Sequence, residues 1–232
     1  MIRELGLLGR RLLVPAALLV GIMVLLGWLL TDVLAQSWLA TTDANINQEL
    51  VEERTNGLNT ASFLFSSLAA TPVIIGLTLV TAATARLVWK RWHEAIYVVY
   101  VVIGEVLIFL ATTLLIDRQR PEVQQLDPAP PTSSFPSGHT AAAVCFYGAA
   151  AAIIAWRVRK RWLRWTVIAL AVAIPLLVGL ARLYRGMHFP TDVTGGLLLG
   201  LVWLGVVTRL VLLAPISAAG DIARKAKETI TR

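Results

Sequence analysis

The sequence predicts an all-α membrane protein, a polytopic bundle of six transmembrane helices. Of its 232 residues, 57% are hydrophobic and only 15% are charged. Soluble domains have roughly 45–50% hydrophobic residues even when glycine is counted, and so little charge cannot cover a soluble surface of this size. The apolar residues also gather in six runs, each close to the roughly 20 residues that a helix needs to cross the hydrocarbon core.

The six runs follow one another with short connections, and no repeat or change of composition marks a second domain in residues 1–232. The predicted spans are Leu12–Leu34, Ser62–Ala85, Ala95–Ile116, His139–Trp156, Leu163–Arg182 and Pro190–Leu213. The first run has features of a signal peptide, since Arg10 and Arg11 precede it and Val33-Leu34-Ala35 resembles a cleavage site. It is longer than the roughly 7–15 residues of a signal core, so we interpret it as a retained anchor.

Basic residues orient the bundle, because Lys and Arg are enriched on the cytoplasmic side of membrane proteins. Sixteen of the 21 basic residues lie in segments 3–11, 86–91, 157–164 and 209–232, which share one side when six spans alternate. Both ends, residues 1–11 and the basic tail 215–232, are therefore predicted to be cytoplasmic in a cell (plasma) membrane. The segment Thr42–Asn59 carries four acidic residues and is predicted to be an outer helix or loop.

Charge and cysteine content argue against other classes of protein. The net charge of +7 could indicate nucleic-acid binding, but the basic residues alternate with apolar runs and form no basic face. The single cysteine, Cys145, cannot form an internal disulfide, and no zinc-binding spacing exists. We therefore predict no nucleic-acid partner and no obligate protein partner; the bilayer is the expected partner.

Polar residues suited to phosphate binding gather in the third and fifth connections, which are predicted to face outward. Ser137-Gly138-His139 stands where a loop enters the fourth span, and backbone N–H groups at the start of a helix bind anions. Gly138 lets the backbone approach a phosphate closely. Arg120 and Arg182 can form bidentate contacts with phosphate oxygens.

A histidine and an aspartate begin the last span. His188 and Asp192 are four residues apart, so on a helix they share one face. A carboxylate beside an imidazole fixes its tautomer and stabilises its charged form. His188 is therefore predicted to be a nucleophile.

These segments resemble the type 2 phosphatidic acid phosphatase family, which is related to the vanadium haloperoxidases. Its signature reads Lys-x6-Arg-Pro, then Pro-Ser-Gly-His, then Ser-Arg-x5-His-x3-Asp. The chain matches it in order at Arg120-Pro121, Pro136-Ser137-Gly138-His139, and Arg182, His188 and Asp192. It departs from the signature at Thr113, where the family has the lysine, and at Ala181, where it has the serine.

The resemblance implies a six-span membrane enzyme that hydrolyses a lipid phosphate or diphosphate without a metal or cofactor, through a phosphohistidine. It implies that His188 attacks phosphorus, that Asp192 orients it, and that His139 protonates the leaving oxygen and then activates water. The residues expected to hold the phosphate are Arg120, Ser137, Gly138 and Arg182, with Arg118 or Arg185 in place of the missing lysine. Arg118 could equally be a charge on the outer surface.

Several readings of the substrate stay open. An outer-facing site and an arginine-rich composition favour an undecaprenyl-type diphosphate, and the alternatives are phosphatidylglycerophosphate and phosphatidate. A non-catalytic homologue that binds or transports lipid phosphates is a further alternative. Haloperoxidase chemistry is disfavoured, because those enzymes are soluble. Glu105, an acid within the third span, is expected to face the bundle interior and is assigned no catalytic role.

Overall fold

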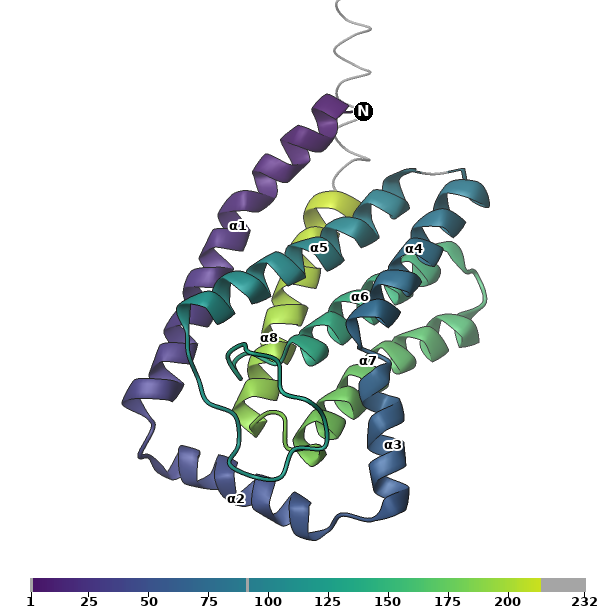
Figure 1. The fold of residues 1–232 in the computed structure, drawn as a ribbon. Helices are drawn as coiled ribbons and strands as arrows, with labels where there is room; N and C mark the ends of the chain where they lie inside the picture. Colours follow the sequence, from purple (N-terminus) through teal and green to yellow (C-terminus); the bar gives the residue numbers. More distant parts are fainter. Residues whose placement is uncertain (1, 91, 214–232) are drawn as a thin grey trace, which may run out of the picture.

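A computed structural model describes residues 2–90 and 92–213 of the chain, and this part is a bundle of helices without strands (Figure 1). Five helical segments are long and apolar enough to cross a membrane, and a bent helix pair makes a sixth crossing. The elements are α1 (Ile2–Trp28) with its π-helical end η1 (Leu29–Val33), α2 (Trp38–Glu52), α3 (Asn56–Ser67), α4 (Thr71–Leu87), α5 (Trp92–Leu115), α6 (Gly138–Arg157), α7 (Arg161–Tyr184), and α8 (Pro190–Val207) with η2 (Thr208–Leu213). The predicted all-α membrane bundle is confirmed.

The second crossing differs from its prediction. Ser62–Ala85 was expected to be one straight helix, whereas α3 and α4 meet at a bend of 45°. The break lies at Ala70, whose backbone is extended (φ −62°, ψ 141°), and Pro72 follows at the start of α4. Proline cannot donate a backbone hydrogen bond to the preceding turn, so the helix ends and restarts. The other five crossings lie within a few residues of their predicted limits.

The core of the bundle lies between α1, α5, α6 and α8. Tyr97, Cys145 and Leu199 are fully buried there. The ring of Trp203 lies against Gly104 so closely that a Cβ on Gly104 would approach it to 2.1 Å. Its Nε1–H donates to the carbonyl of Val101 at 3.0 Å. Many large apolar side chains point outward instead, as lipid-facing positions require.

The first, third and fifth connections meet at one end of the molecule. In Figure 1, α2 and the long loop between α5 and α6 lie at the end opposite the N-terminus, beside the turn between α7 and α8. Of the two alternatives for the acidic segment, a helix or a loop, the structure has a helix, since most of the segment lies in α2. The predicted basic tail, residues 215–232, lies outside the described residues. The fold therefore brings the third and fifth connections together.

Candidate active site

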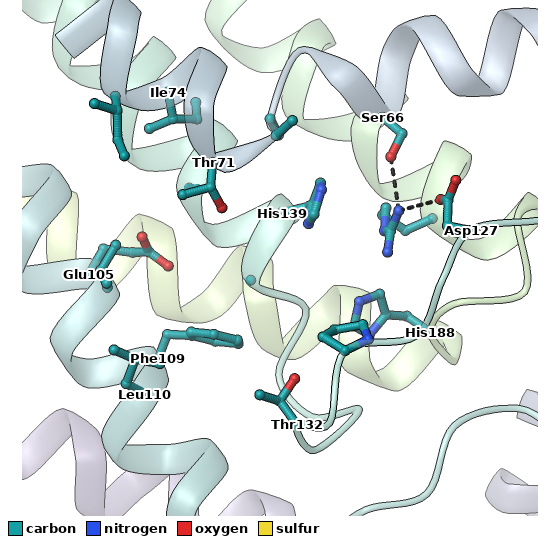
Figure 2. A pocket seen from close by; sticks show the side chains of 18 of the residues that line it. Ser66, Thr71, Ile74, Glu105, Phe109, Leu110, Asp127, Thr132, His139 and His188 are labelled. Atoms are coloured by element: carbon teal, nitrogen blue, oxygen red, sulfur yellow. Dashed lines mark hydrogen bonds and ion pairs between the residues drawn. The ribbon is translucent and has the colours of Figure 1, made fainter. Parts of the chain in front are cut away.

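The signature residues surround one end of a cavity of about 880 Å³. Its polar end is lined by Arg120, Gly138, His139, Arg182 and His188. Its walls come from α5 and from the break between α3 and α4. Figure 2 shows His139 and His188 on neighbouring sides of this space. Five of the eight predicted site residues thus line a single cavity.

His188 is buried and its ring orientation is fixed by the backbone. Its Nδ1 lies 2.8 Å from the carbonyl oxygen of Ser134. A carbonyl oxygen only accepts, so Nδ1 carries the proton and Nε2 carries the free lone pair. Burial lowers the pKa of His188 below its ordinary value, although Asp192 opposes this effect. The ring is therefore neutral near pH 7 and can act as a nucleophile.

Asp192 lies near His188 but makes no direct hydrogen bond with it. Its Oδ2 lies 3.8 Å from Nδ1, beyond hydrogen-bond distance. The same oxygen accepts hydrogen bonds from the hydroxyl of Ser134 and from the backbone N–H of Phe189 at 2.8 Å. Asp192 therefore holds both segments that frame the imidazole, and Ser134 is the direct orienting partner.

Arg118 lies behind Asp192 rather than in the cavity. One nitrogen of its guanidinium contacts Asp192 Oδ1 at 2.5 Å, and another contacts Asp43 Oδ2 at 3.0 Å. Asp43 in turn accepts from the hydroxyl and the backbone N–H of Thr191. Arg118 is only 8% exposed and is absent from the cavity lining. The expected phosphate contact of Arg118 is therefore not part of this geometry, because two carboxylates already occupy its donors.

Arg182 does face the cavity, and an aspartate shares it. One nitrogen of Arg182 donates to Asp127 at 2.8 Å and to the hydroxyl of Ser66 at 2.9 Å, while its Nε–H has no partner. Arg185, the alternative substitute for the lysine, binds Asp127 through two nitrogens. Burial alone would raise the pKa of Asp127, but Arg185 and Arg182 outweigh it and hold that pKa below its ordinary value. An acidic group thus occupies part of the cationic site.

Arg120 forms the opposite side of the cationic end. Its guanidinium donates to the carbonyl of Met187 at 2.7 Å and to that of Thr132 at 3.3 Å. These partners are neutral, so no carboxylate in direct contact balances the positive charge of Arg120. Arg120 and Arg182 are therefore the two cations that line the described cavity.

The start of α6 completes the polar end. Gly138 begins the helix, and a Cβ there would lie 2.9 Å from the ring of Phe109. On the other side, a Cβ on Gly196 would come within 2.4 Å of the carbonyl oxygen of Ser137. Both glycines allow close packing around the unpaired N–H groups that begin a helix. The Ser137 hydroxyl accepts from Thr140 at 3.0 Å and does not line the cavity, unlike its predicted role.

His139, the second residue of α6, lies beside Arg182 and His188 in the same cavity. Its ring makes no hydrogen bond within residues 2–90 and 92–213, so both nitrogens can meet a ligand. Thr113, which replaces the family lysine, lies in the last turn of α5, and its hydroxyl donates to the carbonyl of Leu110. Neither Thr113 nor Ala181 lines the cavity.

Sequence reasoning missed three residues of this site. Ser134 and Asp43 contact Asp192 or its partners across separations of 58 residues or more, which no local pattern reveals. Asp127 offered a signal in the sequence. Only two acids, Glu122 and Asp127, lie between the Arg120-Pro121 and Pro136–His139 motifs. In the described part of the chain, no three His, Cys, Asp or Glu side chains gather closely enough to hold a metal ion, and metal independence stays a prediction.

Known proteins resemble the chain over most of its length. The model of the PAP2 superfamily matches residues 93–214. The chain is 30% identical over 167 residues to phosphatidylglycerophosphatase B of Bacillus subtilis, which covers 70% of this chain and 79% of that protein. It is also 31% identical to the bacitracin transport permease protein BcrC of Bacillus licheniformis, over 46% of this chain and 47% of that protein.

Solved structures show the same fold. The crystal structure of a transmembrane PAP2 type phosphatidylglycerolphosphate phosphatase from Bacillus subtilis superposes with a TM-score of 0.74 at 26% identity, covering 83% of this chain and 94% of that one. The LpxE structure from Aquifex aeolicus gives a TM-score of 0.58 at 22% identity, covering 71% of this chain and 93% of that one. The second similarity concerns the fold alone.

Proposed function

This chain belongs to the PAP2 superfamily of lipid phosphatases and crosses the membrane several times, and on that premise we propose that it hydrolyses a glycerolipid phosphate monoester with His188 as the nucleophile. The observation that carries the proposal is the fixed tautomer of His188. Its Nδ1–H is held by Ser134, and Nε2 is left free beside two arginines that line the cavity.

The proposed reaction has two steps. First, Nε2 of His188 forms a bond to phosphorus while the bond to the lipid oxygen breaks, and protonated His139 gives its proton to that oxygen. Second, His139 takes a proton from water, whose oxygen attacks phosphorus and releases phosphate from His188. Arg120, Arg182 and the N–H groups at Gly138 stabilise the negative charge on the phosphoryl oxygens.

The cationic end suits one phosphate better than two. Two arginines line the cavity among the described residues, and Asp127 partly neutralises Arg182. The other two nearby arginines, Arg118 and Arg185, are held by carboxylates. A monoester carries about two negative charges, which two arginines balance, whereas a diphosphate carries more. Phosphatidate carries a single phosphate of this kind. The relatives are named for phosphatidylglycerophosphate, which has a phosphodiester beside its terminal monoester, so their names support the glycerolipid part of the proposal.

The undecaprenyl-type diphosphate stays as a second candidate. It is supported by the predicted outward position of the site, since sixteen basic residues lie toward the opposite side. A diphosphate would need a further cation, and displacement of Asp127 from Arg185 would supply one.

The lipid tail has a path into the cavity from the bilayer. Three side chains that line the cavity, Ile75 of α4 and Ile103 and Leu107 of α5, are more than half exposed. They support a mouth of the cavity between α4 and α5 that opens toward lipid. We infer that the acyl chains stay in the membrane while the phosphate reaches His188.

One experiment tests the function. Purified protein in detergent is given phosphatidylglycerophosphate, phosphatidate and undecaprenyl diphosphate, and phosphate release is measured with and without EDTA. We expect hydrolysis of the monoesters in EDTA, and its near-complete loss in His188→Ala and His139→Ala. His93→Ala is the matched control, because His93 bonds the carbonyl of Val211 at 2.6 Å, far from the cavity. Full activity in His188→Ala contradicts the proposal.

Sidedness needs its own measurement. We propose that both termini are cytoplasmic and that the cavity opens on the extracytoplasmic side. Pro130→Cys and Lys160→Cys, each in a Cys145→Ala background, place one thiol at each exposed end of the bundle. A membrane-impermeant reagent added to intact cells should label position 130 only. Labelling of position 160 alone would reverse the orientation.

A further inference from the structure

One acidic side chain lies in the cavity and takes no part in the proposed reaction. Glu105, in the middle of α5, is 1% exposed and lines the same cavity as His139. Figure 2 shows its carboxyl group extending from α5 toward the interior of the cavity, on the far side of His139 from His188. Its neighbours on the wall, including Ile74, Val102 and Val106, are apolar.

Glu105 has no internal partner that explains its burial. Its Oε2 is buried without a hydrogen bond, and no ion pair involves it in the described residues. By contrast, Glu94 at the other end of α5 pairs with Arg157. A buried carboxyl group without a partner is unfavourable. Its presence in a ligand cavity therefore indicates a polar group supplied by the ligand.

The position of Glu105 defines where that group lies on the substrate. Gly138, at the phosphate end, packs against Phe109, and Glu105 precedes Phe109 by one turn of α5. At 1.5 Å per residue, Glu105 is about 6 Å further along α5 from the phosphate end than Phe109. In phosphatidate, the ester carbonyls lie a few bonds from phosphorus on the side of the acyl chains, at a comparable distance.

We propose that Glu105 donates a hydrogen bond to an ester carbonyl of a glycerolipid and thereby selects glycerolipid phosphates over polyprenyl phosphates. In its acid form a carboxyl group is a donor, and an ester carbonyl is an acceptor only. A polyprenyl chain offers only C–H groups at this depth and leaves the carboxyl unpaired. The inference rests on the proposed function, because it names the substrate class of the same site.

A matched pair of lipids tests this contact. The substrates are phosphatidate and its dialkyl ether analogue with the same chain lengths, which lacks both carbonyls. Wild-type protein should prefer the ester lipid in kcat/KM by roughly three- to tenfold, as one hydrogen bond allows. Glu105→Leu should bring this ratio close to one by slowing the ester lipid alone. Glu105→Gln keeps an N–H donor and should retain most of the preference.

A second measurement does not depend on turnover. Thermal unfolding of the wild type and of Glu105→Leu is recorded with diacylglycerol and with its dialkyl ether analogue. These two lipids are the uncharged products of the two substrates above. Diacylglycerol should stabilise wild-type protein more than the ether does, and Glu105→Leu should remove the difference. If hydrolysis fails but this difference stands, the proposed function is wrong and the contact holds. An ester preference that Glu105→Leu leaves unchanged, or an equal loss on both lipids, overturns the inference.

Discussion

Two clusters of arginine and aspartate flank His188, and they differ in what can reach them. In the closed cluster, Arg118 is held between Asp43 and Asp192, and both acids are at most 2% exposed. In the open cluster, Asp127 lies between Arg182 and Arg185 and lines the cavity. The same residue types thus form a buried cluster on one side of His188 and a cluster that faces the cavity on the other.

The comparison shows that counting arginines in a motif does not count phosphate contacts. Arg118 and Arg120 are two residues apart, yet their guanidinium groups face different partners. The partners of Arg118 come from α2 and α8, so the closed cluster ties α2 to the start of α8. We infer that its role is to position Asp192, and through Ser134 the ring of His188.

The largest effect is expected when the closed cluster is broken. Arg118→Ala leaves two buried carboxylates without a cation, which typically costs about 3–5 kcal/mol of folding free energy. Thermal unfolding in detergent should show a large fall in the melting temperature. Asp43→Asn, which keeps one acceptor for Thr191, should fall less. A normal melting temperature with weakened phosphate binding in Arg118→Ala would restore Arg118 to the phosphate site.

Arg182→Ala tests the open cluster and should act on catalysis. It removes one charge-assisted contact to the phosphoryl group, worth roughly 1.5–3 kcal/mol. Turnover should therefore drop roughly ten- to a hundredfold, with a smaller loss of stability than in Arg118→Ala. Steady-state kinetics and unfolding on the same samples measure both effects. The comparison fails if Arg182→Ala destabilises the protein as much as Arg118→Ala and leaves kcat/KM unchanged.

A smaller effect is expected from Asp127→Asn. In the wild type, the Asp127 carboxylate competes with phosphate for Arg182, and the amide does not carry that charge. Inorganic phosphate and vanadate should therefore inhibit Asp127→Asn more strongly, by roughly two- to fivefold, as expected for a partly exposed ion pair. Ser66→Ala, which removes the neutral partner of Arg182, is the control and should change inhibition little. Weaker inhibition of Asp127→Asn would mean that Asp127 holds the arginines in place for phosphate.

The smallest effect is the pH dependence of this ion pair. The pKa of Asp127 is below its ordinary value, so its stabilising contribution is complete above the unfolded value of about 3.9 and is lost as pH falls through the folded value. The difference in melting temperature between wild type and Asp127→Asn should stay constant from about pH 8 to pH 5 and shrink only below about pH 4. A difference that disappears near neutral pH would contradict the arrangement.

The sequence predicted the crossings and the cavity-lining motif residues but not the connections between them. Pro190–Leu213 was predicted with the limits that the structure has, because a long apolar run has one stable state in a membrane. The break at Ala70 was missed because the apolar run continues through it. Pro72 by itself does not show whether the helix is interrupted there. Arg118 was considered as a phosphate contact because its actual partners were not visible in the sequence. The two buried acids, Asp43 and Asp192, lie 75 and 74 residues away from it. Such pairings depend on packing, which spacing along the chain does not encode.

The mouth that we propose for the cavity, between α4 and α5, determines in which units the substrate concentration has to be expressed. A substrate that arrives through lipid-facing Ile75 and Leu107 is met in two dimensions, so its effective concentration is its mole fraction in the bilayer. Adding inert lipid or detergent at constant substrate then lowers the rate by surface dilution, even though the bulk concentration is unchanged. Under the proposed function, the rate therefore depends on the composition of the membrane, and a KM expressed per volume of solution has no fixed meaning.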